Sequence, residues 1–107
     1  MKFGRQFKFG DIIIAEVQFV DTFEIKSRPA LVLFQEYGNI VAVVITSNPK
    51  MEGVPITKKE GMVADSVIKL NYIFTISEAM VKKHLFSISE EKKKRIKIEL
   101  MKRLIID

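Results

Sequence analysis

The chain has 107 residues and a formal charge of +5, with 48% hydrophobic and 29% charged side chains, which fits one folded globular domain (residues 1–107) and argues against disorder. It contains no cysteine, which excludes disulfides, Cys-ligated zinc, iron–sulfur clusters and a thiol nucleophile. Its single histidine leaves no histidine pair for a metal, so no metal site is predicted.

Short apolar and β-branched segments predict strands through the first two-thirds of the chain. The first strand is expected at residues 11–19, and the polar stretch 20–27 after it is expected to be a loop. Pro29 can open a strand but cannot sit inside a paired one. We therefore expect the second strand at residues 30–34, with Arg28 just before its start.

The middle of the chain alternates turn and strand signals. Glu36 to Asn39 predicts a tight turn, and the apolar run Ile40 to Ile45 predicts a strand buried on both faces. Residues 46–49, Thr-Ser-Asn-Pro, are expected to end that strand. Three further segments are expected to be strands or to extend one: 54–57, 66–70 and 72–76.

The hydrophobic period changes toward the C-terminus. Met80 and Val81 suit one helical turn, and from Ser89 onward apolar residues recur at spacings of three and four. This pattern predicts an amphipathic helix over about residues 89–105, with Ser89 as its N-cap and basic residues on the polar face. Its apolar stripe consists of Ile96, Leu100, Met101, Leu104 and Ile105. Short strands followed by one closing helix predict a mainly β (β-rich α+β) fold, a small barrel flanked by that helix.

The positive charge lies in the last part of the chain. Acidic and basic residues balance over residues 1–81, whereas residues 82–103 hold nine basic and three acidic ones. Such a patch can attract a polyanion, and it is equally typical of a solvated helix face. The longest apolar runs fall far short of the ~20 residues that span a bilayer, so no membrane segment is predicted.

Polar residues at two strand ends are candidates for a functional site. Arg28, held beside a proline, is a rigid charged fork that suits a phosphate, although it could also brace the surface against a nearby glutamate. Residues 46–48 can hold an oxyanion with their side chains and turn N–H groups, or can simply form the turn. Asp11 is expected to cap a turn, and His84 to be a surface or packing residue.

Read in order, these segments resemble the MazF/PemK-like toxins of type II toxin–antitoxin systems. The resemblance covers about residues 9 to 105, and its most specific parts are RPALVL and ITSN. The matching segments are GDI at 10–12, Phe19, KSRPALVL at 26–33, VVITSN at 43–48, DSVI at 65–68 and the basic helix. It implies an SH3-like barrel of about five to seven short strands, shared with the CcdB-like gyrase poisons.

The resemblance also implies an activity and partners. MazF members are homodimeric, metal-independent endoribonucleases that cut single-stranded RNA. We therefore expect a cytoplasmic enzyme without a cofactor, with messenger RNA as substrate and a separate antitoxin protein as partner. The absence of cysteine is compatible with the reducing cytosol.

Carried over by residue, the arginine of the family's RP motif falls on Arg28 and the threonine of its TS motif on Thr46. An acidic residue of the first loop falls on Glu24. These three are the expected catalytic residues, and the expected RNA contacts are Ser47, Asn48, Lys26 and Phe19. Two features depart from the pattern: the loop at 20–27 is short and lacks glycine, and Phe86 stands where a turn glycine is frequent.

Without metal ligands, the RNA's own 2′-OH is the expected nucleophile. It would attack the adjacent phosphorus and leave a 2′,3′-cyclic phosphate and a 5′-OH end. Arg28 would neutralise the phosphate, Thr46 would donate a hydrogen bond and Glu24 would act as base. Two alternatives stay open: a non-catalytic RNA- or protein-binding module, and a CcdB-like gyrase poison, which would not need Arg28 and Thr46.

Overall fold

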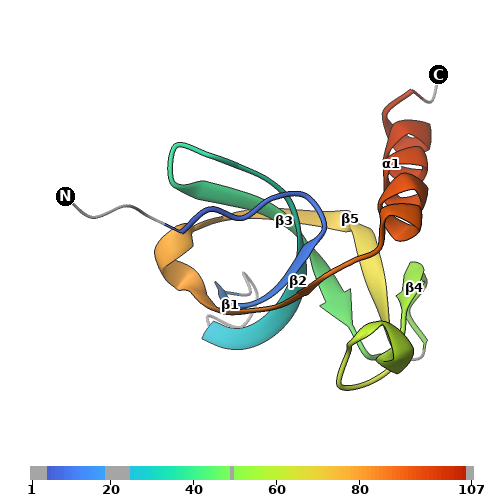
Figure 1. The fold of residues 1–107 in the computed structure, drawn as a ribbon, viewed down its shortest axis with the longest axis horizontal. Helices are drawn as coiled ribbons and strands as arrows, with labels where there is room; N and C mark the ends of the chain where they lie inside the picture. Colours follow the sequence, from blue (N-terminus) through green and yellow to red (C-terminus); the bar gives the residue numbers. More distant parts are fainter. Residues whose placement is uncertain (1–4, 19–24, 49, 106–107) are drawn as a thin grey trace.

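The computed structural model describes residues 5–18, 25–48 and 50–105. They form one curled antiparallel sheet with a single α-helix after it (Figure 1). The strands are β1 (Asp11–Gln18), β2 (Ile25–Glu36), β3 (Asn39–Thr46), β4 (Val54–Ile56), β5 (Ser66–Ser77) and β6 (Val81–Ser87). Two 3-10 turns, η1 (Lys58–Glu60) and η2 (Glu78–Met80), join strands, and α1 spans Glu90–Leu104. The predicted mainly β fold with a C-terminal helix is confirmed.

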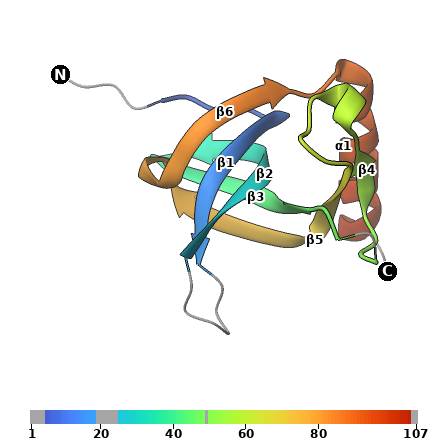
Figure 2. The same ribbon diagram turned by 90° about the horizontal axis from the view of Figure 1, so that it is seen from below.

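The sheet curls because its long strands change partners along their length. The strand order is β4-β5-β3-β2-β1-β6, with antiparallel neighbours throughout. The first half of β2 pairs with β1 and its second half with β3. Irregular pairing also bends β5 against β3, between Val43 and Val44. The result is a half-barrel with α1 at one end, beside β4 (Figure 2).

The second strand begins earlier than predicted. Ile25 to Ser27 belong to β2 and not to a loop, and both Arg28 and Pro29 lie inside the strand, opposite β1. The prediction that Pro29 opens the strand is therefore wrong. A proline is tolerated here because pairing with β3 starts only at Ala30, so one side of the strand has no partner at Pro29.

Strand β6 was not predicted. Its sequence contains the polar run Lys82, Lys83 and His84, which does not show the alternating pattern of a strand. Two irregularities in the pairing with β1 shift side chains between the faces of the sheet and so remove that alternation. The expected helical turn at Met80 and Val81 is likewise wrong for Val81, which starts β6.

The central strands are buried on both faces, as predicted for β3. Neighbouring residues such as Ile12 and Ile13, or Ala42 and Val43, belong to two different hydrophobic clusters. The tight turn at 36–39 is also present and places Tyr37 and Gly38 at positive φ. The pairing of β1, β2 and β3 therefore fixes where the polar side chains on these strands begin.

Helix α1 begins as predicted, with the Ser89 hydroxyl accepting from the backbone N–H of Lys92 at 3.1 Å. Its predicted stripe is only partly buried: Ile96 is fully covered, whereas Met101 and Leu104 are exposed. The basic residues are not all on the outer face either, since the Lys92 side chain is 14% exposed and reaches Glu60. None of the helices in the described parts of the chain is long and apolar enough to cross a membrane.

Candidate functional site

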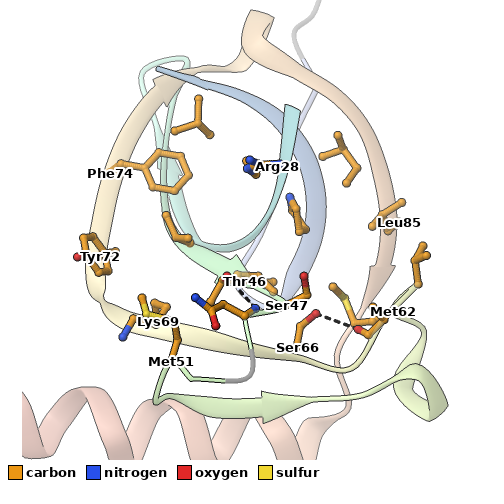
Figure 3. A pocket seen from close by; sticks show the side chains of 18 of the residues that line it. Arg28, Thr46, Ser47, Met51, Met62, Ser66, Lys69, Tyr72, Phe74 and Leu85 are labelled. Carbon is orange, nitrogen blue, oxygen red and sulfur yellow. Dashed lines mark hydrogen bonds between the residues drawn. The ribbon is translucent and has the colours of Figure 1, made fainter. Parts of the chain in front are cut away.

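A cavity of about 1060 Å³ opens between β2, β3 and β5 (Figure 3). Arg28 comes from β2 and lies near its centre in this view, whereas Thr46, the last residue of β3, and Ser47 lie below it. Asn48 lines the cavity from the turn after β3, and Lys69 lines it from β5. The structure thus brings together four of the predicted site residues, which come from two segments of the sequence.

The backbone explains why Arg28 and Thr46 both line the cavity. The β2–β3 ladder runs from the turn at Gly38 and ends at the pair Ala30 and Val44. Arg28 and Thr46 each lie two residues beyond this last pair. Pro29 has no N–H to donate, and the ladder does not extend past it. The two strands therefore separate just where these polar side chains stand, and the cavity opens between them.

The charges that line the cavity are positive. Arg28 and Lys69 both line it, and no acidic side chain of the described residues does. Arg28 is exposed and, within those residues, its side chain makes no hydrogen bond or ion pair, so its guanidinium is available to a ligand. Two cations with no lining carboxylate suit an anion, and a guanidinium fork suits phosphate oxygens.

Lys69 is an unusual cavity residue because a charged side chain is rarely buried. It is 8% exposed, and its ammonium donates to the backbone oxygen of Glu52 at 3.0 Å. The ammonium also lies 5.6 Å from the ring centroid of Tyr72. Sequence reasoning missed Lys69, although a lone lysine inside the apolar stretch 66–70 was a visible signal.

Part of the 46–48 segment serves its own turn. The Thr46 hydroxyl oxygen accepts from the backbone N–H of Asn48 at 3.2 Å, and the Asn48 side chain accepts from the N–H of Lys50 at 3.0 Å. These two N–H groups are therefore not free to hold an oxyanion. The Thr46 hydroxyl hydrogen is still available, because its oxygen is the acceptor in that bond.

One other predicted site residue in the described part of the chain is not brought into the cavity. Lys26 is exposed on β2 and does not line it. Glu24 and Phe19 lie outside the described residues. Phe86, expected at a turn, lies in β6, where its ring meets Gly61.

Asp11, His84 and Ser87 form a separate polar cluster that does not line the cavity. Asp11 Oδ1 accepts from Ser87 Oγ at 2.7 Å and lies 3.3 Å from His84 Nε2, while Oδ2 accepts from the Lys8 N–H at 2.9 Å. This is not a Ser-His-Asp relay, because the same imidazole nitrogen faces both Asp11 and Ser87. The turn cap predicted for Asp11 is confirmed.

Hydrogen bonds set the charge state of Asp11. Burial alone would raise the pKa of this carboxyl, but hydrogen bonds from the Lys8 backbone, Ser87 and His84 outweigh it, and the pKa lies below its usual 3.8. The cluster therefore holds an ionised Asp11 that ties β1 to β6. Across the described residues, no group of three or more His, Cys, Asp or Glu side chains could hold a metal ion.

Comparison with known proteins places the chain in context. Residues 8–104 match the family model described as a PemK-like, MazF-like toxin of type II toxin–antitoxin systems. The sequence has no significant match among curated proteins.

Solved structures share the fold at low sequence identity. The Mycobacterium tuberculosis toxin MazF-mt6 superposes with a TM-score of 0.74 at 19% identity, over 91% of this chain and 98% of that one. The MazE–MazF structure from Deinococcus radiodurans gives 0.73 at 15%, over 99% and 100%. A mycobacterial endoribonuclease in complex with its cognate antitoxin gives 0.71 at 13%, over 94% of each chain.

Proposed function

The chain belongs to the PemK-like, MazF-like toxins of type II toxin–antitoxin systems, and from this premise we propose that it is an endoribonuclease of single-stranded RNA. The observation that carries the proposal is the cavity that Arg28 and Thr46 both line. A guanidinium without a partner among the described residues, a hydroxyl with an available hydrogen and a second cation match the needs of a phosphodiester whose charge grows during cleavage.

The proposed reaction uses the substrate's own nucleophile. The 2′-oxygen of one ribose bonds to the adjacent phosphorus while the bond from phosphorus to the 5′-oxygen breaks. The proton leaves the 2′-OH for a base, and the departing 5′-oxygen takes up a proton. The products are a 2′,3′-cyclic phosphate and a 5′-OH end, without a metal or cofactor.

Each residue has a distinct role in this proposal. Arg28 neutralises the non-bridging oxygens, and we assign it no proton transfer because a guanidinium does not give up its proton in proteins. Thr46 donates its hydroxyl hydrogen to the phosphate, with Ser47 beside it. Glu24 is the proposed base.

The proposed contacts to the rest of the RNA strand are Asn48, Lys26 and Phe19. Asn48 lines the cavity, which supports its contact. For Lys26, exposure on the strand that carries Arg28 is the support. Phe19, like Glu24, is proposed from the family motif alone. The proposed substrate is messenger RNA, met in the cytoplasm.

We also propose two protein partners, a second copy of the chain and an antitoxin. Apolar side chains of α1 are exposed in the single chain, Met101 by 55% and Leu104 by 81%, and a dimer would cover them. A Met101→Asp variant should then elute as a monomer in size-exclusion chromatography with light scattering. An antitoxin is supported by the family and by the related complexes from Deinococcus radiodurans and mycobacteria.

The test is cleavage of a long single-stranded RNA in excess EDTA by protein freed of any antitoxin. Arg28→Ala should lower the rate by at least ~10²-fold. Arg95→Ala, which removes an exposed arginine of α1, should cut normally at saturating RNA. Fragments should carry 5′-OH ends, and a 2′-deoxy nucleotide at the cut site should stop the reaction.

Other outcomes would replace the proposal. RNA that is bound but not cut would identify a non-catalytic binding module. Cleavage of the 2′-deoxy substrate, or wild-type rates from Arg28→Ala, would contradict the mechanism.

A further inference from the structure

Tyr72 stands on the rim of the cavity, on an irregular part of β5. Val43 pairs with Ile73 and Val44 pairs with Lys69, so residues 70–72 have no partner on β3. Tyr72 is 53% exposed although it lines the cavity, and Figure 3 shows it on the same strand as Lys69. A large aromatic ring left open beside a cationic cavity is not explained by packing of the fold.

The ring of Tyr72 is held from one side by a fixed cation. The Lys69 ammonium lies 5.6 Å from the ring centroid and is itself anchored on the Glu52 carbonyl oxygen at 3.0 Å. Lys69 is buried, so its ammonium has little freedom to move away from the ring. The ring is thus positioned before any ligand arrives, while more than half of the side chain stays exposed.

Resting on the proposed ribonuclease function, we propose that Tyr72 stacks a nucleobase of the RNA strand, next to the phosphate bound by Arg28 and Thr46. Proteins that bind single-stranded RNA join a cationic groove for the backbone to aromatic side chains for the bases. The cavity offers both parts: Arg28 and Lys69 are the cations, and Tyr72 is an open ring on the rim. Exposed Ile73 extends the apolar rim beside it.

The chain's composition allows a direct test. It contains two tyrosines and no tryptophan, so in Tyr37→Phe the ultraviolet emission comes from Tyr72 alone. In Tyr72→Phe it comes from Tyr37, which is 98% exposed in the β2–β3 turn and does not line the cavity. The probe is a short single-stranded RNA made wholly of 2′-O-methyl nucleotides, which cannot be cleaved, with binding followed independently by anisotropy of a dye on the RNA.

Stacking should quench the emission of the Tyr37→Phe protein at saturating RNA and leave that of Tyr72→Phe unchanged, after correction for absorption by the RNA. Equal quenching in both proteins, or none in either while anisotropy reports binding, would overturn the inference and leave the ribonuclease proposal intact. An absence of both RNA binding and cleavage by wild-type protein would instead overturn the ribonuclease proposal, and this inference with it.

A second measurement separates the ring from the hydroxyl. Tyr72→Phe should bind the probe as wild type does, whereas Tyr72→Leu should bind roughly 5- to 150-fold more weakly. Single abasic positions along the probe should weaken wild-type binding most at one position and should have little effect there on Tyr72→Leu. If Tyr72→Leu and wild type respond equally to every abasic position, no base stacks on Tyr72. The circular dichroism melts of the variants control for folding.

Discussion

Arg28 on β2 and Thr46 on β3 each lie two residues beyond the last pair of that ladder, Ala30 and Val44, and both line the cavity. Their positions are therefore set by the two strands that carry them. Because Arg28 is exposed and Thr46 is half-buried, either side chain should be replaceable without loss of the fold.

Substitutions at Thr46 separate the hydroxyl from the volume of the side chain. Thr46→Val removes the proposed donor, and we expect a roughly 10- to 100-fold lower cleavage rate at saturating RNA, since hydrogen bonds to charged groups contribute about 1.5–3 kcal/mol. Thr46→Ser keeps the hydroxyl and should retain most activity. Single-turnover cleavage of a defined RNA measures both variants, and a Thr46→Val protein as fast as wild type would remove Thr46 from the mechanism.

Lys92 connects α1 to the sheet. Its ammonium donates to the backbone oxygen of Pro55 at 2.7 Å and lies 3.1 Å from the Glu60 carboxylate, with the side chain only 14% exposed. Lys92→Met leaves both acceptors without this donor, and we expect a free energy of unfolding lower by about 1–3 kcal/mol. Lys94→Met is the matched control, because Lys94 is exposed on the same helix and should change little. Equal urea midpoints for the two variants would contradict the prediction.

The stability of the protein should depend on the charge of Asp11. Its folded pKa lies below 3.8, so the unfolded chain binds a proton more readily than the folded one. Asp11 therefore contributes stability above about pH 4, and this contribution is lost as the pH falls through the folded pKa. Asp11→Asn should unfold more easily at neutral pH, and its deficit against wild type should shrink in acid. Urea unfolding at several pH values measures this, and a deficit constant with pH would show that the charge is irrelevant.

Gly61 combines a backbone constraint with a close approach. Its φ is +129°, and a Cβ there would lie 2.8 Å from the Phe86 ring. Gly61→Ala should therefore lower the melting temperature through both strain and displacement of Phe86, at a cost of roughly 1–3 kcal/mol. Gly38→Ala provides the comparison, since Gly38 also has positive φ, +79°, but would meet nothing within 4 Å. If the two substitutions lower the melting temperature equally, the contact with Phe86 does not contribute to the effect.

Local chemistry made much of this fold predictable from the sequence. The turn at 36–39, the buried run of β3 and the Ser89 cap depend on residues close in the chain, and all three are present. Strand β6 depends instead on a distant partner, β1, and its polar run gives no local sign of that pairing. Likewise β2 starts early because β1 lies beside it.

The residues of the candidate site also fall into two groups, those that the local sequence predicts and those that it does not. Arg28 and Thr46 were found because each stands in a short recognisable segment. Tyr72 lies on the part of β5 that has no partner on β3, and no local pattern in the sequence predicts this irregularity. For residues that irregular pairing places at the cavity, a functional role can therefore be proposed only from the structure.

The pairing of Asp11 with Ser87 has a consequence for synthesis of the protein. Strand β1 is the first strand to be made, yet its second partner, β6, is the last. A growing chain that stops before residue 81 has no β6 to place along β1, and it presents an open strand edge able to pair with other molecules. The sheet can be completed only after residues 81–87 have left the ribosome, so a translation product interrupted before them is prone to aggregate through the open edge of β1.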